Sequence, residues 1–298
     1  MEQLIQKMQN FGIEWEQNCP LSKHSSFHIG GAADLALFPK SSDELCQALA
    51  LLKENEVSIL VIGNGSNVVF SDEGYRGAVV FTGKCRKIQI EGDTVYADAG
   101  VSLSALSSAA RDEGLSGLEF AFGIPGTLGG AVYMNAGAYG GSMSDVCIFS
   151  EYYDLQTGRI ERLFEGEQNF GYRTSDYQSH PERIILGATM KLKMGERRLI
   201  SEQMRTYWDK RRNTQPLELP NAGSTFKRPE GYFAGKLIED CGLKGLTVGG
   251  AQVSTKHAGF IVNIGGATCE DVKRLVEQIK ATVLQQTGVE LECEIKFL

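Results

Sequence analysis

The stretch that decides the fold spans residues 123–140 and reads GIPGTLGGAVYMNAGAYG. Residues 123–141 contain seven glycines and one proline, so the segment predicts neither a helix nor the core of a strand. The Val, Met and Ala side chains between the glycines indicate burial rather than a loose linker. A long buried loop lined by glycine usually wraps a ligand. We therefore expect a flat or extended cofactor here, with a purely structural loop as the alternative.

A second glycine turn lies upstream, where the apolar segment 57–63 runs into GNGSN at 63–67. Its two glycines let backbone N–H groups approach a phosphate, and its serine and second asparagine add donors. The turn is not a dinucleotide-binding fingerprint, because Val68 occupies the third glycine position, and no Gly-Lys-Ser/Thr follows as in a P-loop. By itself it fits a surface turn as well as a phosphate site.

Around these turns the periodicity predicts an α+β fold. Residues 35–38 and 57–63 read as strands on either side of a helix that begins at the Ser41-x-x-Glu44 capping box. Together they predict a right-handed β-α-β unit with a parallel pair of strands. Further strands are expected at 78–82, 87–91, 94–98, 146–155, 159–164, 183–193 and 291–297, and further helices at 102–113, 196–212, 237–240 and 269–287.

Charge divides the 298-residue chain more sharply than its net value of −7 suggests. Residues 1–192 carry 14 basic and 24 acidic groups, whereas residues 193–298 carry 16 and 13. We predict a first domain at 1–193, with lobes at about 1–56 and 57–193, and a second at 194–298. The basic balance of the second domain suits an anionic ligand.

Composition also excludes several classes of protein. The acidic balance argues against a nucleic-acid binder, and no stretch reaches the ~18 apolar residues of a membrane span, so we expect no membrane insertion. Seven scattered cysteines without a CxxC pair favour reduced thiols. We therefore expect a cytoplasmic protein.

A metal centre is not expected. His24 and His28 are four residues apart and close to Cys19, but the alternation over 23–29 predicts a strand, on which the two rings would not converge. No second Cys/His cluster completes a set of ligands.

Three polar segments suit an anion without requiring one. Residues 171–177 (GYRTSDY) and 221–229 (NAGSTFKRP) mix cationic, hydroxyl and turn residues, and each by itself fits an ordinary polar loop. The basic run 210–212 fits a solvated helix end as well as a phosphate clamp.

Taken in order, these segments resemble the UDP-N-acetylenolpyruvoylglucosamine reductases, flavoenzymes of peptidoglycan precursor synthesis. The resemblance covers about residues 20 to 298 and rests on five motifs, at 63–67, 123–140, 172–177, 222–229 and LECEI at 291–295. It implies a FAD-binding unit of the vanillyl-alcohol-oxidase type, made of two α+β lobes, and a C-terminal α+β substrate domain. The short interval between Tyr177 and Arg183 implies the compact subtype, which lacks an extra tyrosine-bearing loop.

The resemblance also implies roles for individual residues. It assigns catalysis to Arg173, Ser224 and Glu294. It assigns FAD binding to Gly63, Asn64, Gly65, Ser66, Asn67, Pro125, Gly126, Thr127, Gly130 and Ala131. Contacts to the UDP-sugar fall to Tyr172, Lys227, Arg228, Lys236 and His257. Two positions depart from the family pattern, because Cys293 replaces its usual Pro and Arg228 replaces a common Asn.

The implied reaction has two halves. NADPH reduces FAD, and a hydride then passes to C3 of the enolpyruvyl group, so that negative charge develops at C2 and in the carboxylate. Arg173 meets this enolate as a permanently charged fork of donors, and Ser224 supplies the proton to C2. Glu294 either donates a hydrogen bond in its protonated form or orients Arg173. The choice of NADPH over NADH rests on the resemblance.

Two alternatives stay open from the residues. One is another flavin oxidase or dehydrogenase of the same fold, acting on an alcohol or a hydroxy acid. The other is a nucleotide sensor that keeps the FAD loops without chemistry. We expect a monomer or a weak oligomer.

Overall fold

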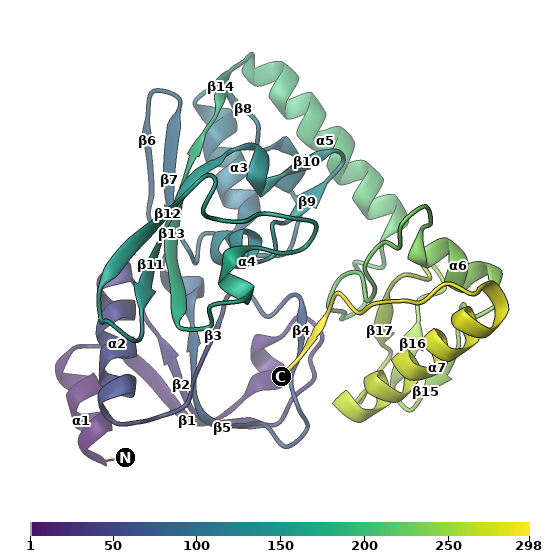
Figure 1. The fold of residues 1–298 in the computed structure, drawn as a ribbon, viewed down its shortest axis with the longest axis horizontal. Coiled ribbons are helices and arrows are strands. Elements are labelled where there is room, and N and C mark those ends of the chain that lie inside the picture. Colours follow the sequence, from purple (N-terminus) through teal and green to yellow (C-terminus); the bar gives the residue numbers. More distant parts are fainter. Residues whose placement is uncertain (1) are drawn as a thin grey trace. The chain divides into compact units, whose positions relative to one another are not determined.

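The protein, seen in a computed structural model that describes residues 2–298, is α+β as predicted (Figure 1). The chain forms two compact units. Unit 1 comprises the residues up to 17, residues 35–64 and residues 77–210, and unit 2 comprises residues 18–34, 65–76 and 211–298. This grouping differs from the predicted division at 193, because two N-terminal segments cluster with the C-terminal residues.

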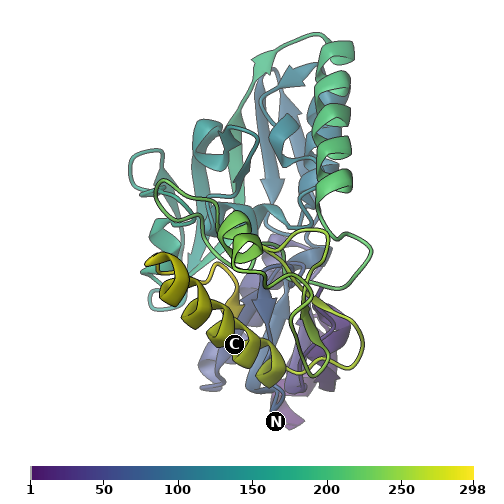
Figure 2. The same cartoon turned by 90° about the vertical axis from the view of Figure 1, so that its right-hand side faces the viewer.

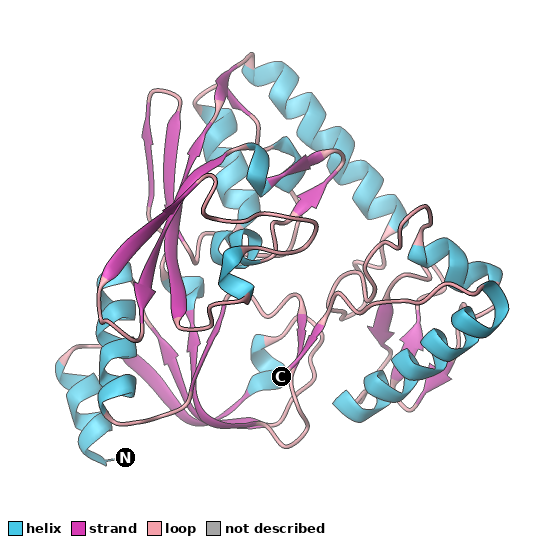
Figure 3. Ribbon diagram, in the orientation of Figure 1, coloured by secondary structure: helices cyan, strands magenta, loops and turns pink. Residues whose placement is uncertain are grey.

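The five-stranded sheet of unit 1 has the order β12-β11-β13-β7-β6, and all its pairs are antiparallel. Helix α3 (Leu103–Asp112) begins at Ser102, whose hydroxyl accepts from Ala105 N, as the sequence predicts. Buried side chains of α3, of the short helix α4 (Leu128–Tyr133) and of the sheet form one apolar core. Figure 3 draws the helices in cyan and the strands in magenta. The strands are β6 (Ile88–Glu91), β7 (Thr94–Asp98), β11 (Cys147–Asp154), β12 (Ile160–Phe164) and β13 (Arg183–Lys191).

A second sheet has the order β1-β2-β5-β3, with β1 (Glu14–Pro20), β2 (Ala32–Phe38), β5 (Tyr75–Phe81) and β3 (Ile59–Ile62). The predicted β-α-β unit is present, but β5 lies between β2 and β3 and forms the parallel pair with β3. Helix α2 (Ser42–Glu54) begins at Ser41 as predicted, because the Ser41 hydroxyl accepts from Glu44 N. Helices α1 (Glu2–Asn10) and α2 lie side by side (Figure 1).

Helix α5 (Arg197–Thr214) matches the predicted amphipathic helix and is the long straight helix of Figure 2. Ile200 and Met204 are buried, and Tyr207 stacks on Tyr139 at 4.4 Å between ring centres. Short antiparallel pairs complete the unit: β8 (Leu115–Ser116) with β14 (Lys193–Met194), and β9 (Gly137–Ala138) with β10 (Gly141–Ser142).

Unit 2 is built on a three-stranded sheet in the order β15-β16-β17, with α6 (Ala234–Asp240) and α7 (Cys269–Thr287) sharing its core. Helix α7 begins at the predicted capping box of Thr268 and Asp271 and ends at Gly288, whose φ is +73°. Its predicted apolar face is buried. The strands are β15 (Thr247–Val248), β16 (Ala251–Val253) and β17 (Ile261–Asn263).

Segment 65–76 belongs to unit 2 because of long-range hydrogen bonds. The Asp72 carboxylate accepts from Cys269 N at 2.8 Å and from Glu270 N at 3.1 Å, the first turn of α7. Strand β4 (Val68–Val69) pairs in parallel with β18 (Lys296–Phe297). The predicted strand at 291–297 is therefore wrong except at its end.

Within residues 2–298, five 3-10 helices connect these elements. They are η1 (Leu21–His24), η2 (Thr82–Lys84), η3 (Glu119–Ala121), η4 (Met143–Asp145) and η5 (Asp176–Gln178). The strand expected over 23–29 is wrong, because η1 occupies its start and His28 has a left-handed φ of +57°.

Candidate active site

Gly63, the first residue after β3, faces the residue that precedes α4. A Cβ at Gly63 would lie 2.2 Å from Thr127 Oγ1, so the contact requires glycine. Thr127 is 1% exposed, and among the residues that the structure describes its hydroxyl has no hydrogen-bond partner. A buried polar atom without a partner is rare in native proteins. The glycine turn and the hydroxyl therefore fit the FAD that both were predicted to bind, because a ligand oxygen would complete the site.

The glycine-rich stretch contains a helix, so the prediction that it would not is wrong. Helix α4 is anchored by two backbone donors, with Leu128 N bonded to Val101 O and Gly129 N to Ala99 O, both at 2.8 Å. A Cβ at Gly129 would lie 2.9 Å from Ala99 Cβ. Tertiary hydrogen bonds and a close approach thus form a helix where the local propensity opposes one. The N–H groups of Leu128 and Gly129 are therefore already bonded within the protein. The residues predicted to contact FAD lie on either side of them in the sequence, and they are Pro125, Gly126, Thr127, Gly130 and Ala131.

The second half of the GNGSN turn lies in unit 2, because the boundary between the units falls after Asn64. Gly65 has φ +59°, and a Cβ there would lie 2.4 Å from His24 O. The Asn67 side chain donates to Glu294 O at 3.2 Å, and Lys296 N donates to Asn67 O at 3.0 Å. Asn67 was predicted to bind FAD, and the structure gives it a further task, holding the backbone of Glu294.

Two segments far apart in the sequence pair within unit 2, and the pairing sets Glu294 against Thr225, the residue that follows Ser224. Glu294 N donates to Thr225 O at 2.9 Å, and Lys227 N donates to Glu292 O at 2.8 Å. Between these bonds Phe226 and Cys293 form an antiparallel bridge. The structure therefore places the segment that carries Ser224 against the segment that carries Glu294.

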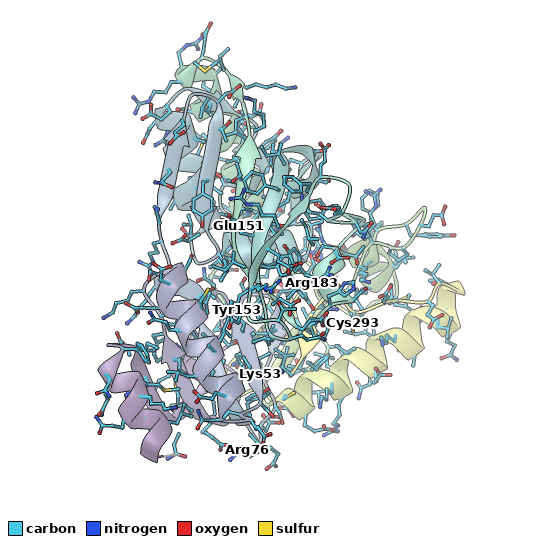
Figure 4. All side chains as sticks on the ribbon, turned by 60° about the vertical axis from the view of Figure 1, so that its left-hand side comes forward. Lys53, Arg76, Glu151, Tyr153, Arg183 and Cys293 are labelled. Atoms are coloured by element: carbon cyan, nitrogen blue, oxygen red, sulfur yellow. The ribbon has the colours of Figure 1, made fainter. Side chains whose placement is uncertain are left out.

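The same ladder explains the Cys293 departure. Neither of the two flanking bonds uses the N–H of residue 293, so the proline that the family resemblance implies and the cysteine found here are both compatible with the register. Cys293 is half-buried (Figure 4), and this burial raises the pKa of its thiol.

Arg173 lies at the tip of a tight turn in unit 1. Gly171 N donates to Thr174 O at 3.1 Å and Thr174 N to Gly171 O at 3.4 Å, which leaves Tyr172 and Arg173 as the loop. Arg173 has φ +57°, and its Nη2 donates to Gly137 O at 3.2 Å. The guanidinium carbon lies 5.2 Å from the ring centre of Tyr172, which is 54% exposed.

The predicted substrate cations already have partners in the protein. Lys227 forms an ion pair with Glu292, and Lys236 forms one with Asp240 on the exposed side of α6. The hydrogen bond that Lys236 donates to the Asp240 carboxylate raises the pKa of Lys236. Arg228 lies over the ring of Phe233, with 3.9 Å from the guanidinium carbon to the ring centre.

His257 is held as a neutral ring. Its Nδ1 accepts from Gly259 N at 3.1 Å, so the proton is assigned to Nε2. Burial lowers the pKa of His257 below its ordinary value. A Cβ at Gly235 would lie 2.9 Å from His257 Cε1, so Gly235 makes room for the ring.

Sequence reasoning missed Thr225. Its hydroxyl accepts from Ile261 N at 3.1 Å and its backbone N donates to Gly259 O at 2.9 Å, which ties the Ser224 segment to β17. A single threonine in a polar loop gives no sequence signal for this role.

The structure also places a ring nitrogen of His24 within 4.8 Å of Cys19 Sγ. The expectation that no metal binds stays a prediction.

Comparison with known proteins identifies two family matches. Residues 215–298 match the family described as UDP-N-acetylenolpyruvoylglucosamine reductase, C-terminal domain, and residues 33–163 match the FAD binding domain. Two curated relatives bear the name UDP-N-acetylenolpyruvoylglucosamine reductase. The relative from Pediococcus pentosaceus is 46% identical, over 94% of this chain and 92% of the relative. The one from Caldanaerobacter subterraneus is 47% identical, again over 94% of this chain and 92% of the relative.

Comparison with solved structures identifies the same family. The UDP-N-acetylenolpyruvylglucosamine reductase from Thermus caldophilus superimposes with a TM-score of 0.80 at 34% identity, covering 96% of this chain and 98% of the other. An alkyldihydroxyacetonephosphate synthase shares the fold alone, with a TM-score of 0.50 at 17% identity, over 65% of this chain and 41% of the other.

No helix within residues 2–298 combines the length and the apolar character that a membrane span requires. The FAD-binding match and the named relatives agree on an FAD-dependent oxidoreductase. With relatives above 40% identity along nearly its whole length, the chain belongs to the UDP-N-acetylenolpyruvoylglucosamine reductase family.

Proposed function

We propose that the protein catalyses the NADPH-dependent reduction of UDP-N-acetylglucosamine enolpyruvate to UDP-N-acetylmuramate in peptidoglycan precursor synthesis. Bound FAD supplies the hydride for C3 of the enolpyruvyl group. Family membership supports the reaction class. The observation that carries the residue roles is the ladder between 225–227 and 292–294, which puts Ser224 and Glu294 on paired segments.

Ser224 donates the proton to C2. A hydroxyl is a weak acid, but a carbanion-like C2 is a strong base, so no stronger acid is needed. Gly223, just before it, has φ +78° and donates its N–H to Asn221 Oδ1 at 2.9 Å, which sets the direction of the chain at Ser224. Glu294 is held through its backbone on both sides, by Thr225 and by Asn67. It donates a hydrogen bond to the enolate or orients Arg173.

Arg173 stabilises the enolate and the carboxylate of the substrate. A guanidinium is always charged and offers a planar fork of donors, which suits an anion spread over several oxygens. Tyr172 covers one side of this guanidinium and contacts the substrate.

The cations of unit 2 hold the diphosphate of the UDP-sugar. Lys227 and Lys236 exchange their carboxylate partners for phosphate at little loss, because a solvent-exposed ion pair contributes only ~0–1 kcal/mol. Arg228, stacked on Phe233, presents a fork where many relatives have a neutral side chain. His257 donates from Nε2 as a neutral group.

The remaining assignments follow from the same proposal. Residues 63–67 and 125–131 hold the FAD pyrophosphate, residues 1–193 form the FAD-binding part of the protein and residues 194–298 bind the substrate. The protein acts in the cytoplasm, where a nucleotide sugar and NADPH are both available, as a monomer or a weak oligomer.

Stopped-flow absorbance tests the proposal by separating the two half-reactions. The purified protein should be yellow, NADPH should bleach the flavin, and the enolpyruvyl sugar nucleotide should restore the colour faster than oxygen does. In Ser224→Ala we expect normal bleaching and a recolouring step slowed roughly 10²–10⁴-fold, because only the second half needs the proton. Ser201→Ala, in which the lost hydroxyl bonds only its own helix, serves as the control.

Two results would contradict the proposal. Recolouring no faster than by oxygen alone would refute the reductase assignment. Equal slowing of both half-reactions in Ser224→Ala would refute the role of Ser224 as proton donor.

A further inference from the structure

The turn that carries Arg173 is strained. In a two-residue loop, a left-handed φ is normally supplied by glycine or asparagine. Arg173 adopts φ +57°, a backbone conformation that is unfavourable for an L-residue with a Cβ. Such a conformation persists only where the surrounding structure holds it, so the groups that hold Arg173 require identification.

Gln178 holds the turn on one side. Its Nε2 donates to Arg173 O at 3.0 Å and to Tyr133 O at 3.0 Å. The carboxamide therefore links the carbonyl of the strained residue itself to the C-terminal end of α4. Ser175 reinforces this link, because its hydroxyl donates to Tyr133 O at 2.7 Å.

Helix η5, which ends at Gln178, is itself fixed to the sheet. Asp176 N donates to Gln168 O at 2.8 Å, and the Asp176 carboxylate accepts from Arg183 Nη1 at 2.5 Å. Arg183 is the first residue of β13 (Figure 4). Gln178 is thus an anchored group rather than a mobile side chain, and it is able to resist relaxation of the turn.

Asn135 holds the turn on the other side. It is 8% exposed, and its Nδ2 donates to Gly171 O at 2.9 Å while its Oδ1 accepts from Ser144 N at 2.9 Å. The Arg173 guanidinium then reaches Gly137 O, two residues beyond Asn135 in the same segment. Both carboxamides therefore attach the turn to the segment 133–144.

We propose that Gln178 and Asn135 are positioning residues for Arg173. Their two carboxamides hold the carbonyls of residues 173 and 171, keep Arg173 left-handed, and thereby aim its guanidinium. If either is removed, the turn relaxes toward negative φ, the Cα–Cβ direction changes, and the guanidinium moves away from the place where the enolate forms. Displacements of about 1 Å are enough to slow a reaction roughly 10²-fold. This inference rests on the proposed role of Arg173.

A double-mutant cycle tests the inference in the intact FAD-loaded enzyme. In Gln178→Ala we expect unchanged FAD content, bleaching by NADPH within about twofold of wild type, and recolouring by the enolpyruvyl sugar nucleotide slowed roughly 10–100-fold. Because Gln178 acts through Arg173, Gln178→Ala should add no further loss to Arg173→Ala. Gln156→Ala, at an exposed turn position of the same unit, is the matched control.

A second measurement does not depend on activity. Trypsin cleaves after Arg173 only when the turn opens, so the cleavage rate at this bond, followed by mass spectrometry, should rise in Gln178→Ala and in Asn135→Asp. Asn135→Asp keeps the acceptor for Ser144 N, loses the donor to Gly171 O and to Ser144 Oγ, and adds a carboxylate that repels the Gly171 carbonyl oxygen. The Gln156→Ala control should be cleaved there at the wild-type rate.

The possible outcomes distinguish a failure of the proposed function from a failure of the proposed positioning role of Gln178. Wild-type recolouring in Arg173→Ala would refute the proposed function, while the cleavage rates would still show whether Gln178 holds the turn. Slow recolouring in Arg173→Ala together with wild-type recolouring in Gln178→Ala would overturn the positioning role. Losses that multiply in the double variant would overturn it as well, because Gln178 would then act independently of Arg173.

Discussion

Two tight turns of unit 1 both have two-residue loops, but the left-handed residue is the first loop residue in one turn and the second in the other. Gly92 and Asp93 connect β6 to β7 between the paired residues Glu91 and Thr94, and Gly92 has φ +62°. Tyr172 and Arg173 form the other loop, and there the left-handed residue is arginine, with φ +57°. A Cβ at Gly92 would meet nothing within 4 Å, so glycine serves only the backbone conformation.

The difference shows where this protein tolerates strain. The Gly92 turn uses the residue with the lowest conformational energy for its geometry and carries no proposed function. The Arg173 turn uses a residue that is unfavourable there, and two carboxamides hold it. Strained backbone that the surroundings over-determine is typical of functional positions, and the contrast makes that inference testable within one compact unit.

The largest expected effect comes from replacing the strained residue. Arg173→Ala and Arg173→Gly should both slow recolouring of the flavin by the enolpyruvyl sugar nucleotide roughly 10²–10³-fold, because each removes the cation that faces the enolate. The two variants should differ in stability. Arg173→Gly should unfold in urea with a free energy about 1 kcal/mol above that of Arg173→Ala, because glycine accepts the positive φ. Equal stability of the two would show that the turn is relaxed in solution.

A smaller effect is expected at the unstrained turn. Gly92→Ala introduces a Cβ into open space, so its whole effect, about 1 kcal/mol of lost stability in urea unfolding, should come from the left-handed φ. Both half-reactions should keep their wild-type rates. Gly166→Ala is the control, because a Cβ there also meets nothing within 4 Å and its φ is not left-handed. A loss at Gly166 as large as that at Gly92 would contradict the argument.

The smallest effect is expected at a third turn, between β11 and β12, which is built by a side chain. The Asp154 carboxylate accepts from Gln156 N at 2.7 Å and Thr157 N at 2.8 Å. Hydrogen bonding, from Thr157 first, lowers the pKa of Asp154 below its ordinary value of 3.8. A lowered pKa in the folded state stabilises the protein above the unfolded-state value, and this contribution is lost as the pH falls through the folded-state value.

Asp154→Asn should therefore weaken the loss of stability on acidification below about pH 4. Urea midpoints at several pH values measure it, with Asp209→Asn on the exposed face of α5 as the control. If the stability of Asp154→Asn fell with pH as steeply as that of the wild type, the hydrogen bonds of the turn would not be lowering the pKa of Asp154.

Local signals explain why the starts of the main helices were predictable. Ser41, Ser102 and Thr268 each accept a backbone N–H three residues ahead, a pattern that needs no information from the rest of the chain. Glycine turns at residues 92 and 158 were predictable for the same reason. The five motifs that indicate the family are likewise short, which is why the predicted reductase assignment agrees with the relatives.

The rest depends on partners distant in the sequence. Helix α4 forms in a glycine-rich stretch because Val101 and Ala99 accept its first N–H groups. Residues 292–294 pair with residues 225–227, and residues 296–297 pair with β4. The Asp72 carboxylate connects segment 65–76 to the first turn of α7. None of these partners is visible in a window of ten to fifteen residues.

By itself, then, the sequence determined the α+β class and the family, since caps, turns and short motifs act over a few residues. The tertiary structure alone decided that Thr127 is a buried hydroxyl facing Gly63, that Asn67 and Thr225 hold Glu294, and that Arg173 is strained. These features depend on contacts between residues that are far apart in the sequence, 36 positions for Asn135 and Gly171 and 227 for Asn67 and Glu294, and no local pattern encodes their geometry.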